Sequence, residues 1–262
     1  MPKFAANLSL LYTELPFLQR FGAAAADGFE AVEFLFPYEY PAAELKQALQ
    51  THGLRQVLFN APPGHWSAGE RGLACLPDRQ EEFRAALEQA LLYASVLDCP
   101  RLHVMAGIAP QDASPEVLYA VYVENLRWAA KRAREQGLQL SIEAINQADM
   151  PGYFLHQQAQ ALDVVAAVGA PNLGVQFDVY HCQVSEGNVS RKLCEVMGRG
   201  LLGHVQIAGA PDRQEPDQGE LRVEVLLRLL DELGYTGYVG CEYRPRAGTR
   251  EGLAWLRPWL KI

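Results

Sequence analysis

Cysteine is scarce in this sequence, and long apolar runs are missing. The five cysteines form no C-x-x-C pair and no spacing typical of a disulfide framework. They are Cys75, Cys99, Cys182, Cys194 and Cys241. The first stretch, MPKFAANLSLLYTELPF, is interrupted too early to indicate a signal peptide or a membrane span. We therefore expect no membrane association and a reducing, cytoplasmic setting.

Positive charge is also in the minority. The chain has 23 Lys and Arg against 31 Asp and Glu, a net charge of −8 and a pI near 5.3. Nucleic-acid binding needs clustered cations, so this balance argues against it. A phosphate-binding P-loop is absent, and no Gly-rich turn follows the first strand-like run. What the sequence does have is 49% hydrophobic residues, enough for a sizeable core.

Strand-like and helix-like segments alternate along the whole chain. Helical patterns cover 78–97, 115–136 and 222–233, and the second begins with Ser114 before Pro115, a typical helix start. The strand-like runs are KFAANL, AVEFLF, RQVLFN, RLHVMA, LQLSIE, LGVQFD, LLGHVQ and GYVGCE. Eight such units in 262 residues predict a single (β/α)₈ TIM barrel over 1–262. A doubly wound sheet is the alternative, but it more often has fewer strands.

The last four strand-like runs each end on a side chain that can bind a metal. These side chains are Glu143, Asp178, Gln206 and Glu242, separated by 35, 28 and 36 residues. Such intervals match one strand, one helix and two connections, so the four groups should meet at the carboxyl end of the barrel. Three carboxylates at such short distances repel one another unless a cation lies between them. The sequence therefore predicts a metal site.

Two long connections should cover that end of the barrel. The segment 61–77 contains His65, a candidate substrate contact, and 208–221 contains Arg213, a candidate for binding a substrate carboxylate. His181 follows Asp178 by three residues, and we expect it in a loop at the mouth because VYHCQ shows no helical pattern.

A deeper polar layer is predicted below the metal site. His204 shares a strand face with Gln206, and Gln176 and Ser141 occupy the same layer on their own strands. We expect them to orient the carboxylates above. Glu33, which lies in the second strand-like run, is expected to be a polar group at the barrel mouth.

The chain resembles the hydroxypyruvate isomerase family of the xylose-isomerase-like barrels from end to end. The motifs that carry the resemblance are FAANLS, AVEFLFPY, AGERGLACLP, IEAIN, QFDVYH, GHVQIAG, PDRQEP-x-x-GE and GCEYRP. In that superfamily Glu, Asp, His and Glu of strands five to eight bind a divalent ion. Glu143, Asp178 and Glu242 match this pattern, whereas Gln206 stands where many relatives have His. This oxygen-rich set favours Mg²⁺ or Mn²⁺.

The resemblance also implies substrate contacts and a reaction. His181, Arg213 and Asp149 fall at positions that contact substrate in the related epimerases, although Asp149 is shorter than their Glu. The family chemistry interconverts hydroxypyruvate and tartronate semialdehyde, with Glu143 and Glu242 moving a proton between neighbouring carbons.

Other functions stay open at this point. The nearest is 2-oxo-tetronate isomerisation, or a related sugar-acid isomerase or epimerase. A metal-dependent phosphodiesterase is a distant alternative, as is a non-catalytic sugar-acid binding protein. A small 2-oxo or hydroxy acid is the expected partner, and the sequence leaves open whether the chain forms a homo-oligomer.

Overall fold

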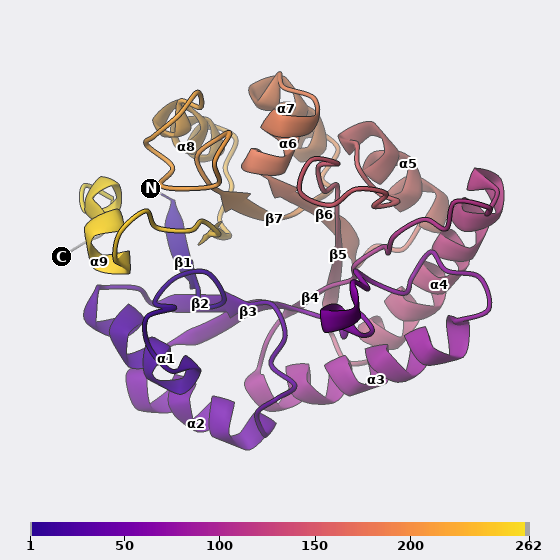
Figure 1. Cartoon of the computed structure of the whole chain (residues 1–262), viewed down its shortest axis with the longest axis horizontal. Coiled ribbons are helices and arrows are strands. Elements are labelled where there is room, and N and C mark those ends of the chain that lie inside the picture. Colours follow the sequence, from indigo (N-terminus) through magenta and orange to yellow (C-terminus); the bar gives the residue numbers. More distant parts are fainter. Residues whose placement is uncertain (1, 260–262) are drawn as a thin grey trace.

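Eight parallel strands close into a barrel in a computed structural model that describes residues 2–259. The strands follow one another around the barrel in chain order, and β8 pairs with β1 (Figure 1). They are β1 (Lys3–Asn7), β2 (Ala31–Phe34), β3 (Arg55–Asn60), β4 (Arg101–His103), β5 (Gln139–Glu143), β6 (Leu173–Asp178), β7 (Leu202–Ile207) and β8 (Tyr238–Cys241). The predicted (β/α)₈ barrel is confirmed.

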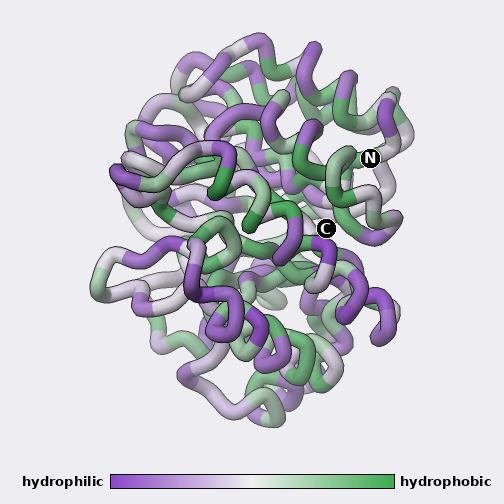
Figure 2. The backbone as a smooth tube through the Cα atoms, turned by 90° about the vertical axis from the view of Figure 1, so that its right-hand side faces the viewer, coloured by the Kyte–Doolittle hydropathy of each residue, from purple (hydrophilic) through white to green (hydrophobic). Residues whose placement is uncertain are grey.

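Helices surround the barrel, and each α-helix buries part of its surface. Along them hydrophilic and hydrophobic residues alternate with the helical turn (Figure 2). They are α1 (Phe17–Ala26), α2 (Ala42–His52), η1 (Trp66–Ala68), α3 (Gln80–Leu97), α4 (Pro115–Glu135), α5 (Gln158–Val168), α6 (Val179–Ser185), α7 (Val189–Gly198), α8 (Val223–Glu232), α9 (Thr249–Gly252) and η2 (Ala254–Leu256). Within residues 2–259, no helix combines the length and the apolar character that a membrane span requires.

The main apolar core lies between the strands and the helices, while polar side chains occupy the inner face of the barrel toward the carboxyl ends of the strands. Val32, Phe59 and Val205 are fully buried in the apolar core. Their strand neighbours point inward by the two-residue alternation of a strand. Those neighbours include Glu33 and His204, whose side chains meet inside the barrel at 2.6 Å. Polar side chains on the inner face therefore form the floor of any site above them.

Candidate active site

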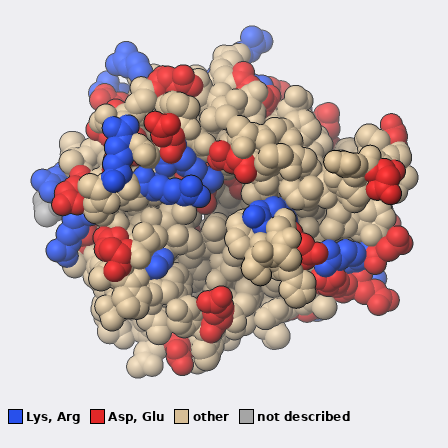
Figure 3. Space-filling model, in the orientation of Figure 1, with Lys and Arg blue, Asp and Glu red and all other residues tan. Residues whose placement is uncertain are grey.

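A cleft of about 410 Å³ opens at the carboxyl ends of the strands. Its floor includes Glu143 and Glu242, and the loops after the strands form its walls with Arg71, Arg213 and Arg244. Lys and Arg side chains gather left of centre on the face drawn in Figure 3, below the position of α8 in Figure 1. The cleft thus combines an acidic floor with a basic rim.

The four predicted metal-binding side chains all reach this end of the barrel. Glu143 and Asp178 are the last residues of β5 and β6, Gln206 is the penultimate residue of β7, and Glu242 directly follows β8. All four are at least 95% buried. The strand ends thus bring all four to one end of the barrel, but of the three acids only Glu143 and Asp178 belong, with His181, to the group of donor atoms within 4.8 Å of one another.

Asp178 has two roles, one of which the sequence interpretation missed. It is the N-cap of α6, and its Oδ1 accepts hydrogen bonds from the backbone N–H groups of Tyr180 at 2.7 Å and His181 at 3.4 Å. The expectation that VYHCQ is not helical was wrong, because a helix of seven residues is too short to show an apolar period. His181 accordingly lies in a helix, 3% exposed, rather than in a loop.

Burial and mutual repulsion raise the pKa values of the acids in the floor of the cleft. Burial, then the charges of Glu242 and Asp178, hold the pKa of Glu143 well above its usual range. Burial raises the pKa of Glu242 to about 8, although the Arg213 guanidinium opposes this. The pKa of Asp178 is raised by burial too, against the lowering by Arg213 and by two backbone N–H donors. The floor therefore holds more acid groups than it can keep ionised without a cation.

The donor set fits a divalent cation. Oxygen or nitrogen atoms of Glu143, Asp178 and His181 lie within 4.8 Å of one another. Oε1 of Glu143 and Oδ2 of Asp178 are buried, and neither has a hydrogen-bond partner in the described part of the chain. Buried carboxylate oxygens left in this state are what a hard cation takes as ligands.

The hydrogen bonds of His181 indicate a donor at its Nε2. Asn146 Oδ1 accepts from the backbone N–H of Asp149 at 2.8 Å, so the amide nitrogen of Asn146 faces His181 Nδ1 at 2.7 Å. Nδ1 is then an acceptor. Burial, with the charge of Arg213, lowers the pKa of His181 well below its usual value, so the ring is neutral. Its hydrogen is on Nε2, 3.9 Å from both Glu143 and Asp178, so in this form the ring is a hydrogen-bond donor and the two carboxylates are the metal ligands of this group.

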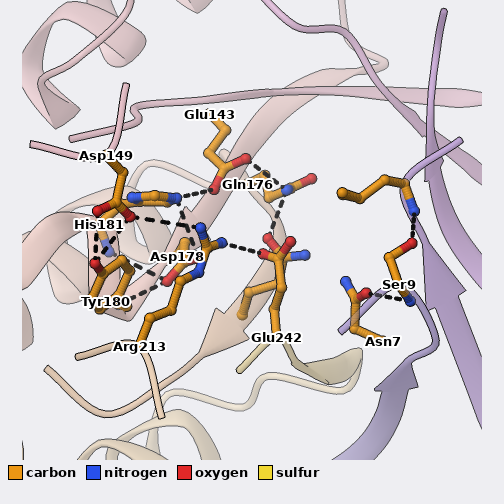
Figure 4. Close-up of polar contacts among 12 residues, drawn as sticks. Asn7, Ser9, Glu143, Asp149, Gln176, Asp178, Tyr180, His181, Arg213 and Glu242 are labelled. Atoms are coloured by element: carbon orange, nitrogen blue, oxygen red, sulfur yellow. Dashed lines mark hydrogen bonds and ion pairs between the residues drawn. The ribbon is translucent and has the colours of Figure 1, made fainter. Parts of the chain in front are cut away.

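Arg213 is the cation that the structure places over this floor (Figure 4). Its guanidinium lies 3.2 Å from Glu242, 3.7 Å from Asp178 and 3.7 Å from Asp149. Tyr180 packs against it, with the guanidinium 5.2 Å from the ring centroid. The Tyr180 hydroxyl donates to Asp149 at 2.9 Å, so Asp149 is linked to the same group.

Glu33 organises the polar layer below the floor, a role that the sequence did not predict. It is fully buried and accepts hydrogen bonds from Asn7 at 3.1 Å, Gln206 at 2.7 Å and His204 at 2.6 Å. It is therefore an internal acceptor and not a group at the mouth. Its place in the middle of AVEFLF, rather than at the end, was the available signal.

Gln176 joins this layer to the floor. Its amide nitrogen donates to Gln206 Oε1 at 2.7 Å and to Glu143 Oε2 at 3.0 Å, while Ser141 donates to its oxygen at 3.2 Å. The arrangement agrees with the predicted polar layer that orients the carboxylates. His103 also reaches the cleft, with its Nε2 3.7 Å from Glu143. Burial lowers its pKa to about 3.

His65 is the one predicted site residue that the structure keeps apart. It is exposed, and its backbone N–H donates to Glu70. Its neighbour Trp66 lines the cleft instead, with the Arg71 guanidinium stacked 3.9 Å from the ring centroid. Trp66 and Arg71 were not singled out by the sequence interpretation.

The closed barrel, with buried acids at the carboxyl ends of its strands, defines the class as an α/β-barrel enzyme. A family profile described as "Xylose isomerase-like TIM barrel" matches residues 21–259, and the chain belongs to this family. Full-length relatives bear the names of isomerases, as the resemblance implied.

Several relatives match over their full length. A 2-oxo-tetronate isomerase of Cupriavidus necator is 57% identical over 261 residues, covering 99% of both chains. A hydroxypyruvate isomerase of Escherichia coli is 42% identical, covering 99% of this chain and all of that protein. A solved structure from Brucella melitensis, described as "AP endonuclease, family 2", superimposes with a TM-score of 0.96 at 47% identity and full coverage.

Proposed function

We propose that this protein isomerises a short 2-oxo acid with a hydroxyl on carbon 3, and that 2-oxo-tetronate is its substrate. The observation that carries the reaction type is the pair of buried carboxyls, Glu143 and Glu242, held three strands apart beside a cation-binding group. The 57% identity to a 2-oxo-tetronate isomerase supports the four-carbon acid. From the sequence alone the three-carbon acid stood slightly ahead.

Glu143, Asp178 and Glu242, with the oxygen of Gln206, are the groups that would hold a divalent ion, and their oxygen-rich character favours Mg²⁺ or Mn²⁺. Such an ion supplies Lewis-acid stabilisation of the charge that develops on the substrate oxygens. The Gln206 amide nitrogen donates to Glu33 at 2.7 Å and its oxygen accepts from Gln176 at 2.7 Å, so Gln206 would bind the ion only by giving up its bond from Gln176.

The two glutamates then act as the acid–base pair. One removes the proton from carbon 3, beside the carbonyl, and the other delivers a proton to carbon 2, while the hydroxyl proton on O3 passes to O2. The ketone thereby moves by one carbon and no atom is gained or lost. A pKa raised toward neutrality, such as that of about 8 for Glu242, suits a group that must both accept and return a proton.

The remaining predicted residues bind the substrate in this proposal. Arg213 would take the substrate carboxylate, since its Nε has no hydrogen-bond partner in the described part of the chain. His181 would donate from Nε2 to a substrate oxygen. Asp149 acts through Tyr180 and Arg213. His65 would contact the substrate only if the loop at 61–77 moved inward, because its side chain lies outside the cleft.

Hydroxypyruvate is the second candidate, since a full-length relative bears that activity in its name. The test compares kcat/KM for hydroxypyruvate and 2-oxo-tetronate with Mg²⁺ or Mn²⁺ present. We expect isomerisation of both acids. The value of kcat/KM should be higher for 2-oxo-tetronate by about tenfold or more, because its additional carbon bears a hydroxyl that can form hydrogen bonds. Glu242→Gln serves as the inactive control. Abasic DNA is included because of the Brucella description, and its cleavage without isomerase activity would replace the proposal.

A further inference from the structure

A second cavity, of about 430 Å³, lies at the amino-terminal end of the barrel, away from the cleft. The first residues of three strands line it, namely Arg55 of β3, Arg101 of β4 and Tyr238 of β8. Helix α2 and the end of α3 contribute the rest of its wall. His204 reaches it from inside the barrel, which links this cavity to the polar layer under the cleft.

Three buried polar atoms of this cavity have no hydrogen-bond partner among residues 2–259: Gln56 Oε1, His204 Nδ1 and Arg101 Nε. Gln56 and His204 are 3% and 0% exposed. The Gln56 amide nitrogen donates to the backbone oxygen of Leu58 at 2.6 Å, which fixes its oxygen as the free acceptor. His204 Nε2 faces a Glu33 carboxylate oxygen at 2.6 Å and so carries a hydrogen, and Nδ1 is an acceptor in the neutral ring.

The cavity is also positively charged in a chain that is acidic overall. It is lined by Lys46, Arg55 and Arg101 against one acid, Asp98. Lys46 is paired with Asp98, whereas neither arginine has an ion pair in the part of the chain described. A guanidinium recognises a carboxylate, and two free acceptors call for hydroxyl donors.

We propose that this cavity is a second binding site, for a small hydroxycarboxylate. The carboxylate would bind Arg101, with Arg55 at the entrance, and the hydroxyl groups would donate to Gln56 Oε1 and His204 Nδ1. A ligand with both groups satisfies all three unpartnered atoms. Inorganic phosphate or a simple carboxylate satisfies them less well.

The site is connected to the cleft by an unbroken chain of hydrogen bonds. His204 donates to Glu33, Glu33 accepts from Gln206 at 2.7 Å, and Gln206 accepts from Gln176 at 2.7 Å. Gln176 in turn donates to Glu143 at 3.0 Å. A hydroxyl bound at His204 Nδ1 would therefore hold the ring that fixes this chain, and turnover should respond to occupancy. This second part rests on the proposed function.

The test is calorimetric titration with glycerate, a three-carbon hydroxycarboxylate, of the wild type, Arg101→Met and Arg134→Met. Arg134 is the matched control, an exposed arginine in the last turn of α4. We expect Arg101→Met to bind one equivalent fewer, or to bind that equivalent at least about tenfold more weakly, which corresponds to one lost charge-assisted contact. Arg134→Met should match the wild type. An unchanged isotherm for Arg101→Met, or no glycerate binding by the wild type, would overturn the proposal.

Propionate and inorganic phosphate test the chemistry of the ligand. Arg101-dependent binding of either as tightly as glycerate would show a general anion site and overturn the assignment. If Arg101→Met does not fold, as judged by its melting temperature, Arg55→Met replaces it with the same expectation. The coupling between this site and the cleft is measured separately. Glycerate should change the kcat of the wild type, and this change should be absent in Arg101→Met. Should the protein lack isomerase activity, the binding titrations still decide the site.

Discussion

The two halves of the barrel end in different side chains. Strands β1–β4 bring neutral groups to the region of the cleft, namely Asn7, Asn60 and His103. Strands β5–β8 bring three acids, Glu143, Asp178 and Glu242, and one amide, Gln206. In the first half His103 and Asn60 pair with each other at 3.2 Å, and no acid reaches the cleft. The second half leaves buried carboxylate oxygens without partners in the described residues. The acidic end of the barrel is therefore the half that needs a cation.

Glu33 sharpens this contrast because it is a buried glutamate in the first half. Three side-chain donors surround it, so hydrogen bonds from the protein satisfy both of its oxygens. Glu143 receives one side-chain hydrogen bond, from Gln176, and faces Glu242 and Asp178. A buried glutamate thus has a structural role where hydrogen-bond donors surround it, as at Glu33. It is a reactive group where other acids surround it, as at Glu143.

The largest expected effect comes from neutralising the acids of the second half. Glu143→Gln and Glu242→Gln should each lower kcat by about 10²–10⁴-fold, the usual contribution of a positioned acid–base group. The fold should survive, because the neutral amide removes a repelled charge. Steady-state kinetics and circular dichroism measure both. Glu195→Gln, at an exposed helical position, is the control, and wild-type turnover in either buried variant would refute the two-carboxylate mechanism.

Arg213→Met should have the next largest effect. Loss of a charged hydrogen bond of about 1.5–3 kcal/mol corresponds to a rise in KM of roughly 10–100-fold for the acid substrate. The substitution keeps an unbranched apolar side chain and removes the guanidinium that lies 5.2 Å from the centroid of the Tyr180 ring. Michaelis constants for the acid and for an uncharged ketose are compared, and an equal loss on both would mean that Arg213 only neutralises Glu242 and Asp178.

Much of this contrast could be predicted from the sequence, and the exceptions have physical reasons. The acids at 143, 178 and 242 follow from strand periodicity and spacing, which need only local pattern. The cap formed by Asp178 and the helix that carries His181 did not follow, because a helix of seven residues is too short to show an apolar period. The role of Glu33 depends on donors from β1 and β7, and such convergence appears only once the barrel closes.

Glu33→Gln tests whether the first half merely supports the second. A glutamine offers one acceptor oxygen, so its amide nitrogen would face at least one of the donors of Asn7, His204 and Gln206. We expect a fall of roughly tenfold in kcat, because Gln206 and Gln176 position Glu143, with KM little changed and the melting temperature lowered. Glu30→Gln, exposed just before the same strand, is the control. A fall in stability with unaltered kcat would show that the two halves are not coupled.

The smallest expected effect is the pH dependence of stability in metal-free protein. The pKa of Glu242 is raised from its ordinary value of 4.5 to about 8 by burial, so the folded state binds a proton more tightly than the unfolded chain. Its stabilising contribution is then complete below pH 4.5 and is lost as the pH rises through about 8. We expect the melting temperature to fall by roughly 5 °C over this window.

Glu242→Gln, which cannot ionise, should show a smaller fall over the same pH range. Added Mg²⁺ should flatten the wild-type profile, because a cation favours the ionised form that high pH produces. Calorimetric scans at several pH values measure the difference between the two proteins, which cancels the titration of all other groups they share. Parallel profiles would mean that Glu242 is ionised across the range. The second half would then need no cation to hold its charge, and its contrast with the first half would disappear.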